Sequence, residues 1–211
     1  MTMKKILSIL LFVSFLFSCK NHEENIEIYL LKNRVRTTEG IPVLEYVKLK
    51  NIKYNKNLEN VKDCNYDSIS KQFIYGGKFT VNKENLESKP LITDKDILKL
   101  NLKKSEFIFS EIGKQKITQL KPNMKSGIQF VICVNKQPYL TGYFRSNISS
   151  NIYNWNYIGY DYFEHKIATI HDKDFVIRQN EGYEKWKPTL CNLNQYSELV
   201  SAFRNTNRII E

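Results

Sequence analysis

The chain has 211 residues, of which 42% are hydrophobic and 26% charged, a composition typical of a folded protein and unlike that of a disordered one. Its formal net charge of +10 suits nucleic acid, anionic lipid headgroups or acidic glycans as partners. The lysines are dispersed and interleaved with acidic residues, as on a solvated surface, so we expect no nucleic-acid binding.

The N-terminal residues are predicted to be an export signal peptide. Lys4 and Lys5 precede an apolar run over 6–17, which has the length of a signal-peptide core and falls short of the roughly 20 residues that span a bilayer. The run ends in Leu16-Phe17-Ser18-Cys19, which resembles the lipobox of bacterial lipoproteins. The resemblance implies cleavage after a signal peptide of residues 1–18 and acylation of Cys19. The alternatives are an ordinary secretory signal and a short helix that stays in the membrane.

Residues 19–25 are predicted to be a tether. The charged stretch Lys20-Asn21-His22-Glu23-Glu24 resembles the surface-export signals of Bacteroidetes lipoproteins, while a plain solvated linker would have a similar composition. Several acyl chains hold a protein firmly, because each buried methylene contributes roughly 0.8 kcal/mol. We therefore expect an outer-membrane lipoprotein of the cell envelope that faces the periplasm or the cell surface, with the membrane as partner through Cys19.

Residues 26–211 are expected to form a single α+β domain, an antiparallel sheet with few helices, with a sub-boundary near residue 90. The alternation Ile26-Glu27-Ile28-Tyr29-Leu30 predicts a half-buried strand. Residues 43–49 form a second extended candidate. The Asn- and Lys-rich stretch 51–67 is expected to be a long loop or an irregular helix.

The next segments carry turn and cap signals. Residues 72–75 and 78–81 flank Gly76-Gly77 and resemble a short hairpin. Thr93 is expected to cap a short helix that ends at Leu98.

The pattern over 105–120 fits neither a helix nor a strand period throughout. We predict a strand over 99–102, another strand that ends at Phe109, and a helix over 113–120 that Pro122 stops.

The strongest signal is the apolar run 128–134, which predicts a strand covered on both faces. A turn at 135–137 and a return strand over 138–144 follow. A further hairpin is expected from 167–170 and 175–177. Asn194 is predicted to cap a C-terminal helix with one apolar face, made by Tyr196, Leu199, Val200 and Phe203.

Three cysteines follow Cys19. Cys133 lies in the apolar strand and should behave as a small buried hydrophobe. If an exported chain oxidises one pair, we expect a bridge between Cys64 and Cys191. No cysteine or histidine cluster has zinc-ligand spacing, so no metal site and no cofactor are predicted.

The segment 97–150 presents a strand, a helix, a glycine link, an apolar strand, a turn and a return strand: Leu98-Lys99-Leu100, a helix ending at Thr118, Gly127, 128–134, Asn135-Lys136, Pro138-Tyr139, Gly142 and Ser149-Ser150. This order resembles the head of the large periplasmic domain of SecD, a subunit of the bacterial protein-export machinery. The chain lacks that family's transmembrane helices, its Asp-Gly turn and its double-glycine segment. The resemblance therefore implies a module over 91–150 that offers a β-hairpin to a partner, and an unrelated α+β domain is the alternative.

Aromatic residues crowd into 153–163 beside asparagines. Exposed rings next to amides suit sugar stacking or protein contact, because rings give contact area at low entropic cost. The alternative is that alternating rings face the core. The candidate binding residues are Tyr153, Trp155, Tyr157 and Tyr160.

Acidic and histidine residues near 161–172 could form a hydrolytic site. Alternatively, these residues lie in exposed turns between strands and have no chemical role. The chain has no GxSxG, HExxH or phosphate-loop motif. We therefore assign no catalytic residue and predict a non-catalytic module that binds an envelope protein or glycan, with an envelope-associated hydrolase as the alternative. The residues of that alternative are Asp161, Glu164, His165, His171 and Asp172.

Overall fold

The computed structural model describes residues 24–211 apart from 54, 60, 152, 161–174 and 180–187. In this part of the chain, short helices accompany sheets whose neighbouring strands are mostly antiparallel. The predicted α+β class is confirmed.

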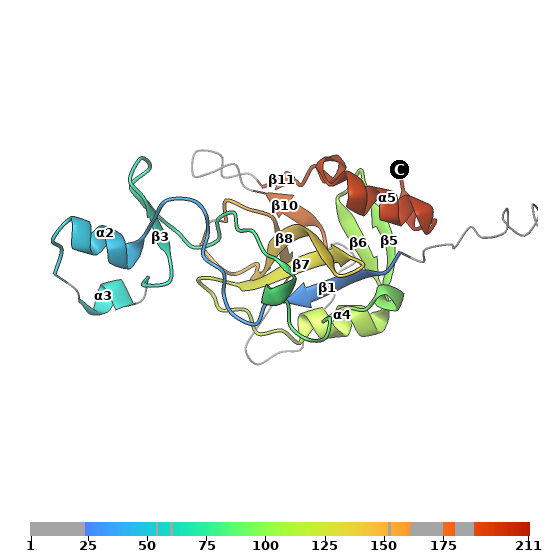
Figure 1. Ribbon diagram of the computed structural model, residues 1–211, viewed down its shortest axis with the longest axis horizontal. Coiled ribbons are helices and arrows are strands. Elements are labelled where there is room, and N and C mark those ends of the chain that lie inside the picture. Colours follow the sequence, from blue (N-terminus) through green and yellow to red (C-terminus); the bar gives the residue numbers. More distant parts are fainter. Residues whose placement is uncertain (1–23, 54, 60, 152, 161–174, 180–187) are drawn as a thin grey trace, which may run out of the picture.

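The centre of the molecule is a six-stranded sheet in the order β1-β7-β8-β9-β10-β11 (Figure 1). All neighbours are antiparallel except β8 and β9, which run parallel. The strands are β1 (Ile26–Leu30), β7 (Ile128–Val134), β8 (Gln137–Ser146), β9 (Tyr157–Tyr160), β10 (Ile177–Gln179) and β11 (Thr189–Leu190).

The β7–β8 hairpin confirms the strongest sequence signal. Every residue of β7 after Ile128 is buried, as the nearly continuous apolar run predicts for a strand covered on both faces. The hairpin turns at Asn135 and Lys136, whose φ angles of 51° and 62° are the positive values that a tight two-residue turn requires.

A second sheet and two helices enclose the main core. The sheet consists of β12 (Ile209–Ile210), β5 (Ile97–Asn101) and β6 (Glu106–Phe109), and the helices are α4 (Glu111–Thr118) and α5 (Ser197–Asn205). α4 begins after Ser110, whose hydroxyl accepts a 3.0 Å hydrogen bond from the Gly113 N–H. The largest side chains of this core are Phe107, Phe109, Phe130, Phe144, Tyr160 and Phe203.

A small lobe stands at one end of the molecule (Figure 1). It has a core of its own, made by Val43, Val47, Val61 and Cys64. The lobe contains β2 (Ile41–Pro42), α2 (Val43–Leu49), α3 (Lys56–Glu59), β3 (Asn65–Asp67) and β4 (Gln72–Ile74).

The predicted strand over 43–49 is wrong, because these residues form helix α2. Val43 and Val47 are four residues apart and lie on one helical face, where they are buried in the core of the lobe. Leu49, which a strand would have placed on that same side, is 65% exposed.

Two further local predictions need correction. β4 pairs with β3 and not with 78–81, so the expected hairpin around Gly76-Gly77 is not formed. After Thr93 only the 3₁₀ turn η2 (Asp94–Asp96) forms, because Ile97 and the residues after it pair with β6.

The C-terminal helix is confirmed, with a later start than expected. The side chain of Asn192 caps the short turn η3 (Leu193–Gln195), and α5 follows from Ser197. The predicted hairpin partner 167–170 lies outside the described residues. Another 3₁₀ turn, η1 (Lys83–Asn85), lies beside the end of β1, where the Asn85 carbonyl accepts a 3.0 Å hydrogen bond from the Lys32 N–H.

The predicted bridge between Cys64 and Cys191 is wrong. Both thiols are free and buried, and they lie in different cores: Cys64 in the lobe and Cys191 in the main core. Cys133 is fully buried, as predicted. Burial raises the pKa of the Cys133 and Cys191 thiols to about 12, so both stay protonated and unreactive at neutral pH.

None of the helices in the described ranges has both the length and the apolarity that crossing a bilayer requires.

Candidate functional site

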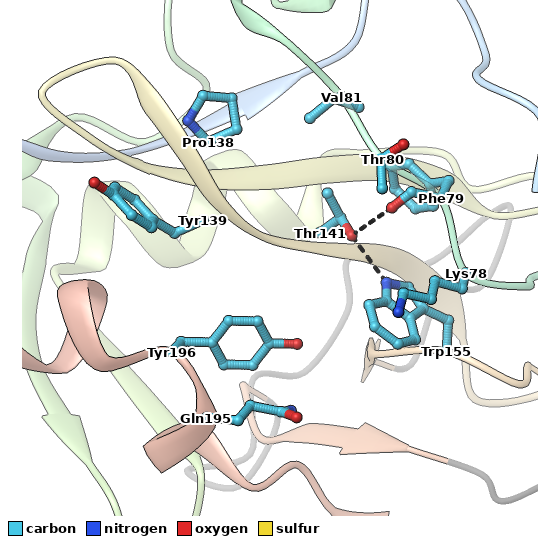
Figure 2. Close-up of a pocket in the computed structure, with 10 residues that line it drawn as sticks. All are labelled: Lys78, Phe79, Thr80, Val81, Pro138, Tyr139, Thr141, Trp155, Gln195 and Tyr196. Atoms are coloured by element: carbon cyan, nitrogen blue, oxygen red, sulfur yellow. Dashed lines mark hydrogen bonds between the residues drawn. The ribbon is translucent and has the colours of Figure 1, made fainter. Parts of the chain in front are cut away.

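A cavity of about 330 Å³ opens beside β8, between the segment 78–81, Trp155 and the residues that precede α5 (Figure 2). Four separate segments of the chain thus meet around it. The lining residues include four aromatic rings, two threonine hydroxyls, one amide and one ammonium group. They are Lys78, Phe79, Thr80, Val81, Pro138, Tyr139, Thr141, Trp155, Gln195 and Tyr196.

Hydrogen bonds fix the backbone of Lys78 at one wall of the pocket. Its carbonyl accepts from the Thr38 N–H at 2.8 Å and from the Thr37 hydroxyl at 2.9 Å. Its N–H donates to Glu39 Oε2 at 3.0 Å. The next residue, Phe79, is 1% exposed and anchors the segment in a core. The exposed Lys78 side chain therefore extends from a backbone with little freedom to move.

Trp155 is held by the same segment. Its indole Nε1 donates to Thr141 Oγ1 at 2.9 Å, and the Thr141 hydroxyl donates to the Phe79 carbonyl at 3.1 Å (Figure 2). The Lys78 ammonium lies 5.2 Å from the centroid of the Trp155 ring, which is within cation–π range. Because its nitrogen is bonded, the ring has a defined orientation at the pocket wall.

Asn156 positions the opposite wall. It is fully buried, and its amide Nδ2 donates to the Thr141 carbonyl at 3.0 Å and to the Tyr196 hydroxyl at 2.8 Å. Its Oδ1 accepts a hydrogen bond from the Gln179 amide. Burial raises the pKa of Tyr196 to about 12, so this ring is neutral at physiological pH. Figure 2 shows the Tyr196 and Gln195 side chains extending toward Trp155 across the open space.

The four predicted binding rings do not share a site. Tyr153, Tyr157 and Tyr160 are 0%, 6% and 1% exposed, so the expectation that they offer open faces to a ligand is corrected, and Trp155 alone of the four lines the pocket. Tyr157 packs with Phe79, Tyr143 and Tyr153 on one face of β9, and Tyr160 packs in the main core on the other face.

The buried rings have a structural role. Tyr153 packs edge-on against Tyr143 with ring centroids 5.2 Å apart. The Arg145 guanidinium lies 5.0 Å from the Tyr153 ring and 4.9 Å from the Tyr157 ring. These tyrosines thus form the cluster against which Trp155 packs.

Sequence reasoning missed most of the pocket. The sequence pattern predicts Tyr139 in the return strand without a binding role and Tyr196 on the apolar face of a helix. Gln195 and Lys78 carry no local signal, because only the tertiary fold brings them to Trp155.

Several predicted residues lie outside the described residues. They are the lipid-attachment residue Cys19 and the members of the alternative hydrolytic set, Asp161, Glu164, His165, His171 and Asp172. Within the ranges that the structure describes, no group of three or more His, Cys, Asp or Glu side chains is placed to hold a metal ion.

Comparison of the chain with family models, curated proteins and solved structures gave no match. The resemblances to bacterial lipoproteins and to the SecD head therefore stay predictions.

Proposed function

We propose that this chain is a non-catalytic, glycan-binding lipoprotein of the bacterial cell envelope, anchored in the outer membrane by acyl chains on Cys19. The observation that carries the proposal is the lining of the pocket. Four aromatic rings, threonine hydroxyls and a glutamine amide meet around one open cavity.

This lining suits a sugar, because a sugar ring has an apolar C–H face and a rim of hydroxyls. Trp155, Tyr139 and Tyr196 offer aromatic surface for the C–H groups. The exposed Gln195 amide and Thr80 hydroxyl can donate and accept hydrogen bonds at the rim.

The size of the pocket favours a glycan over a protein partner. A volume of about 330 Å³ is near the lower end of the roughly 300–1,000 Å³ typical of small-molecule pockets. A stable protein interface covers about 800 Å² on each partner, which is a broad surface and not a small hollow. One or two sugar rings match the cavity better than a folded partner.

The lipid anchor would hold this pocket near the membrane. The folded body begins at Ile26, whose N–H donates to Asp94 Oδ1 at 2.7 Å. The tether of residues 19–25 spans at most about 25 Å when fully extended. Glycans close to the membrane surface are therefore the ones within reach.

Trp155→Ala is expected to weaken glycan binding by more than about tenfold, because it removes the largest ring of the pocket and one anchor of the Thr141 hydroxyl. Binding of the acyl-anchored chain in detergent to a glycan array, followed by titration calorimetry with the best ligand, would measure the loss. Tyr46→Ala is the matched control, since Tyr46 stacks on Tyr66 in the distant lobe. Undiminished binding by Trp155→Ala with a wild-type circular dichroism spectrum would refute the pocket as the site.

Cys19→Ser is expected to move the protein from the membrane fraction to the soluble fraction and to abolish incorporation of labelled fatty acid, because serine offers no thiol for acylation. Cell fractionation and metabolic labelling measure the two effects. His22→Ala, in the same tether, should leave both unchanged. Persistence of Cys19→Ser in the membrane fraction would argue against a lipid anchor at this position.

A further inference from the structure

The charge of the pocket points to a narrower class of ligand. We propose that the sugar bound beside Trp155 carries an anionic group, which forms an ion pair with the Lys78 ammonium. This inference rests on the proposed function and specifies the substrate class of the same site.

The pocket has one formal charge among the described residues that line it. Lys78 supplies an ammonium group, and no carboxylate is part of the lining. Oε2 of the neighbouring carboxylate, Glu39, accepts a hydrogen bond from the backbone N–H of Lys78 at 3.0 Å. In the described part of the chain, Lys78 forms no salt bridge. The cation is therefore available to a ligand.

The position of this cation is fixed more closely than that of an ordinary surface lysine. Its backbone is held by Thr37, Thr38 and Glu39, and its Nζ lies 5.2 Å from the centroid of the Trp155 ring. The ammonium group thus lies beside the aromatic surface that a sugar ring would contact. A sugar with an anionic substituent can meet the ring and the charge together.

The chemistry of lysine sets how selective this contact is. An ammonium is a compact point charge with rotatable donors, and it accepts a carboxylate, a sulfate or a phosphate without the planar match that arginine requires. A charge-assisted hydrogen bond is about twice as strong as a neutral one. We expect an acidic sugar to bind roughly tenfold more tightly than its neutral counterpart, and salt to reduce the difference because the pocket is open.

The test uses acidic polysaccharides, each paired with its carboxyl-reduced neutral form and with a sulfated derivative of that neutral form. The acyl-anchored chain in detergent is titrated against each member at low and high sodium chloride. Preference for the carboxylate form, for the sulfated form or for both supports the inference and identifies the anion.

Three variants separate the charge from the fold. Lys78→Gln should lower the affinity for the acidic form to that for the neutral form. Lys78→Arg should keep the preference. Lys103→Gln removes an exposed lysine from the β5–β6 turn and should change nothing.

The outcomes distinguish the two proposals. Equal binding of acidic and neutral forms by the wild-type chain, or a preference that survives Lys78→Gln, would overturn the anionic ligand while the glycan pocket stands. Failure of every glycan pair to bind would overturn the proposed function and this inference with it.

Discussion

Phe203→Ala is expected to lower the free energy of unfolding by about 4 kcal/mol, since it removes a fully buried ring and leaves a cavity in the main core. Phe203 lies on α5 and meets the Phe107 ring edge-on, with centroids 5.7 Å apart and an interplanar angle of 73°. This contact joins the helix to the second sheet. Urea denaturation followed by far-ultraviolet circular dichroism measures the loss.

Leu98→Ala provides the control for this core prediction. Leu98 is 45% exposed on β5, the strand next to the one that carries Phe107, so its truncation should cost less than about 1 kcal/mol. If Phe203→Ala and Leu98→Ala lowered the free energy of unfolding equally, the packing of α5 would not depend on the Phe203 ring.

The sequence predicts the elements whose signal is local. The run 128–134 is apolar except for Gln129, and Asn135 at the turn tolerates positive φ, so the β7–β8 hairpin follows from the residues alone. The apolar face of α5 is equally plain, because Leu199, Val200 and Phe203 repeat with a helical period. These segments need no knowledge of their neighbours.

The segment 43–49 shows where local reasoning fails. Its apolar residues fit a period of two as well as a period of four. The packing of the lobe favours the helix, because Val61 and Cys64 from later in the chain cover the helical face that holds Val43 and Val47. Only the tertiary packing decides between helix and strand there.

The prediction that the four rings near β9 share one binding surface is wrong for a related reason. Crowded aromatic residues suggest a binding surface, yet β9 pairs with β8 and β10 inside the sheet, and side chains pack on both of its faces. Tyr157 is buried against Phe79, Tyr143 and Tyr153, and Tyr160 is buried in the main core. Trp155 lies just before β9 and reaches the pocket instead.

The buried rings support two of the residues that line the pocket. Tyr143 and Tyr153 pack beneath Trp155, and the Tyr143 hydroxyl donates to the Gly77 carbonyl at 2.8 Å. Gly77 directly precedes Lys78. The aromatic cluster therefore holds both the indole ring and the cation of the pocket in place.

Asp96→Ala is expected to lower the free energy of unfolding by about 3 kcal/mol at pH 7, because it deprives three polar groups of their shared acceptor. Asp96 is 3% exposed and joins η2 to α4. Its carboxylate accepts from Ser110 Oγ at 2.8 Å, from Lys116 Nζ at 2.9 Å and from Thr93 Oγ1 at 2.9 Å. Chemical denaturation of both proteins at a series of pH values measures the difference.

The pH dependence of this difference has a definite sign. Burial alone would raise the pKa of Asp96, but the hydrogen bonds from Lys116, Ser110 and Thr93 outweigh it and hold the pKa below its ordinary value. The folded state therefore binds the proton less readily than the unfolded chain does, and the stabilisation is complete above the unfolded pKa of about 3.9. The stabilisation is lost as the pH falls through the lower, folded pKa.

The difference in the free energy of unfolding between wild type and Asp96→Ala should be constant from about pH 7 to pH 5 and should shrink below pH 4. Asp63→Ala, which removes an exposed carboxylate, should differ only slightly from wild type in its free energy of unfolding. If the difference between wild type and Asp96→Ala became larger in acid, it would contradict the assigned hydrogen bonds.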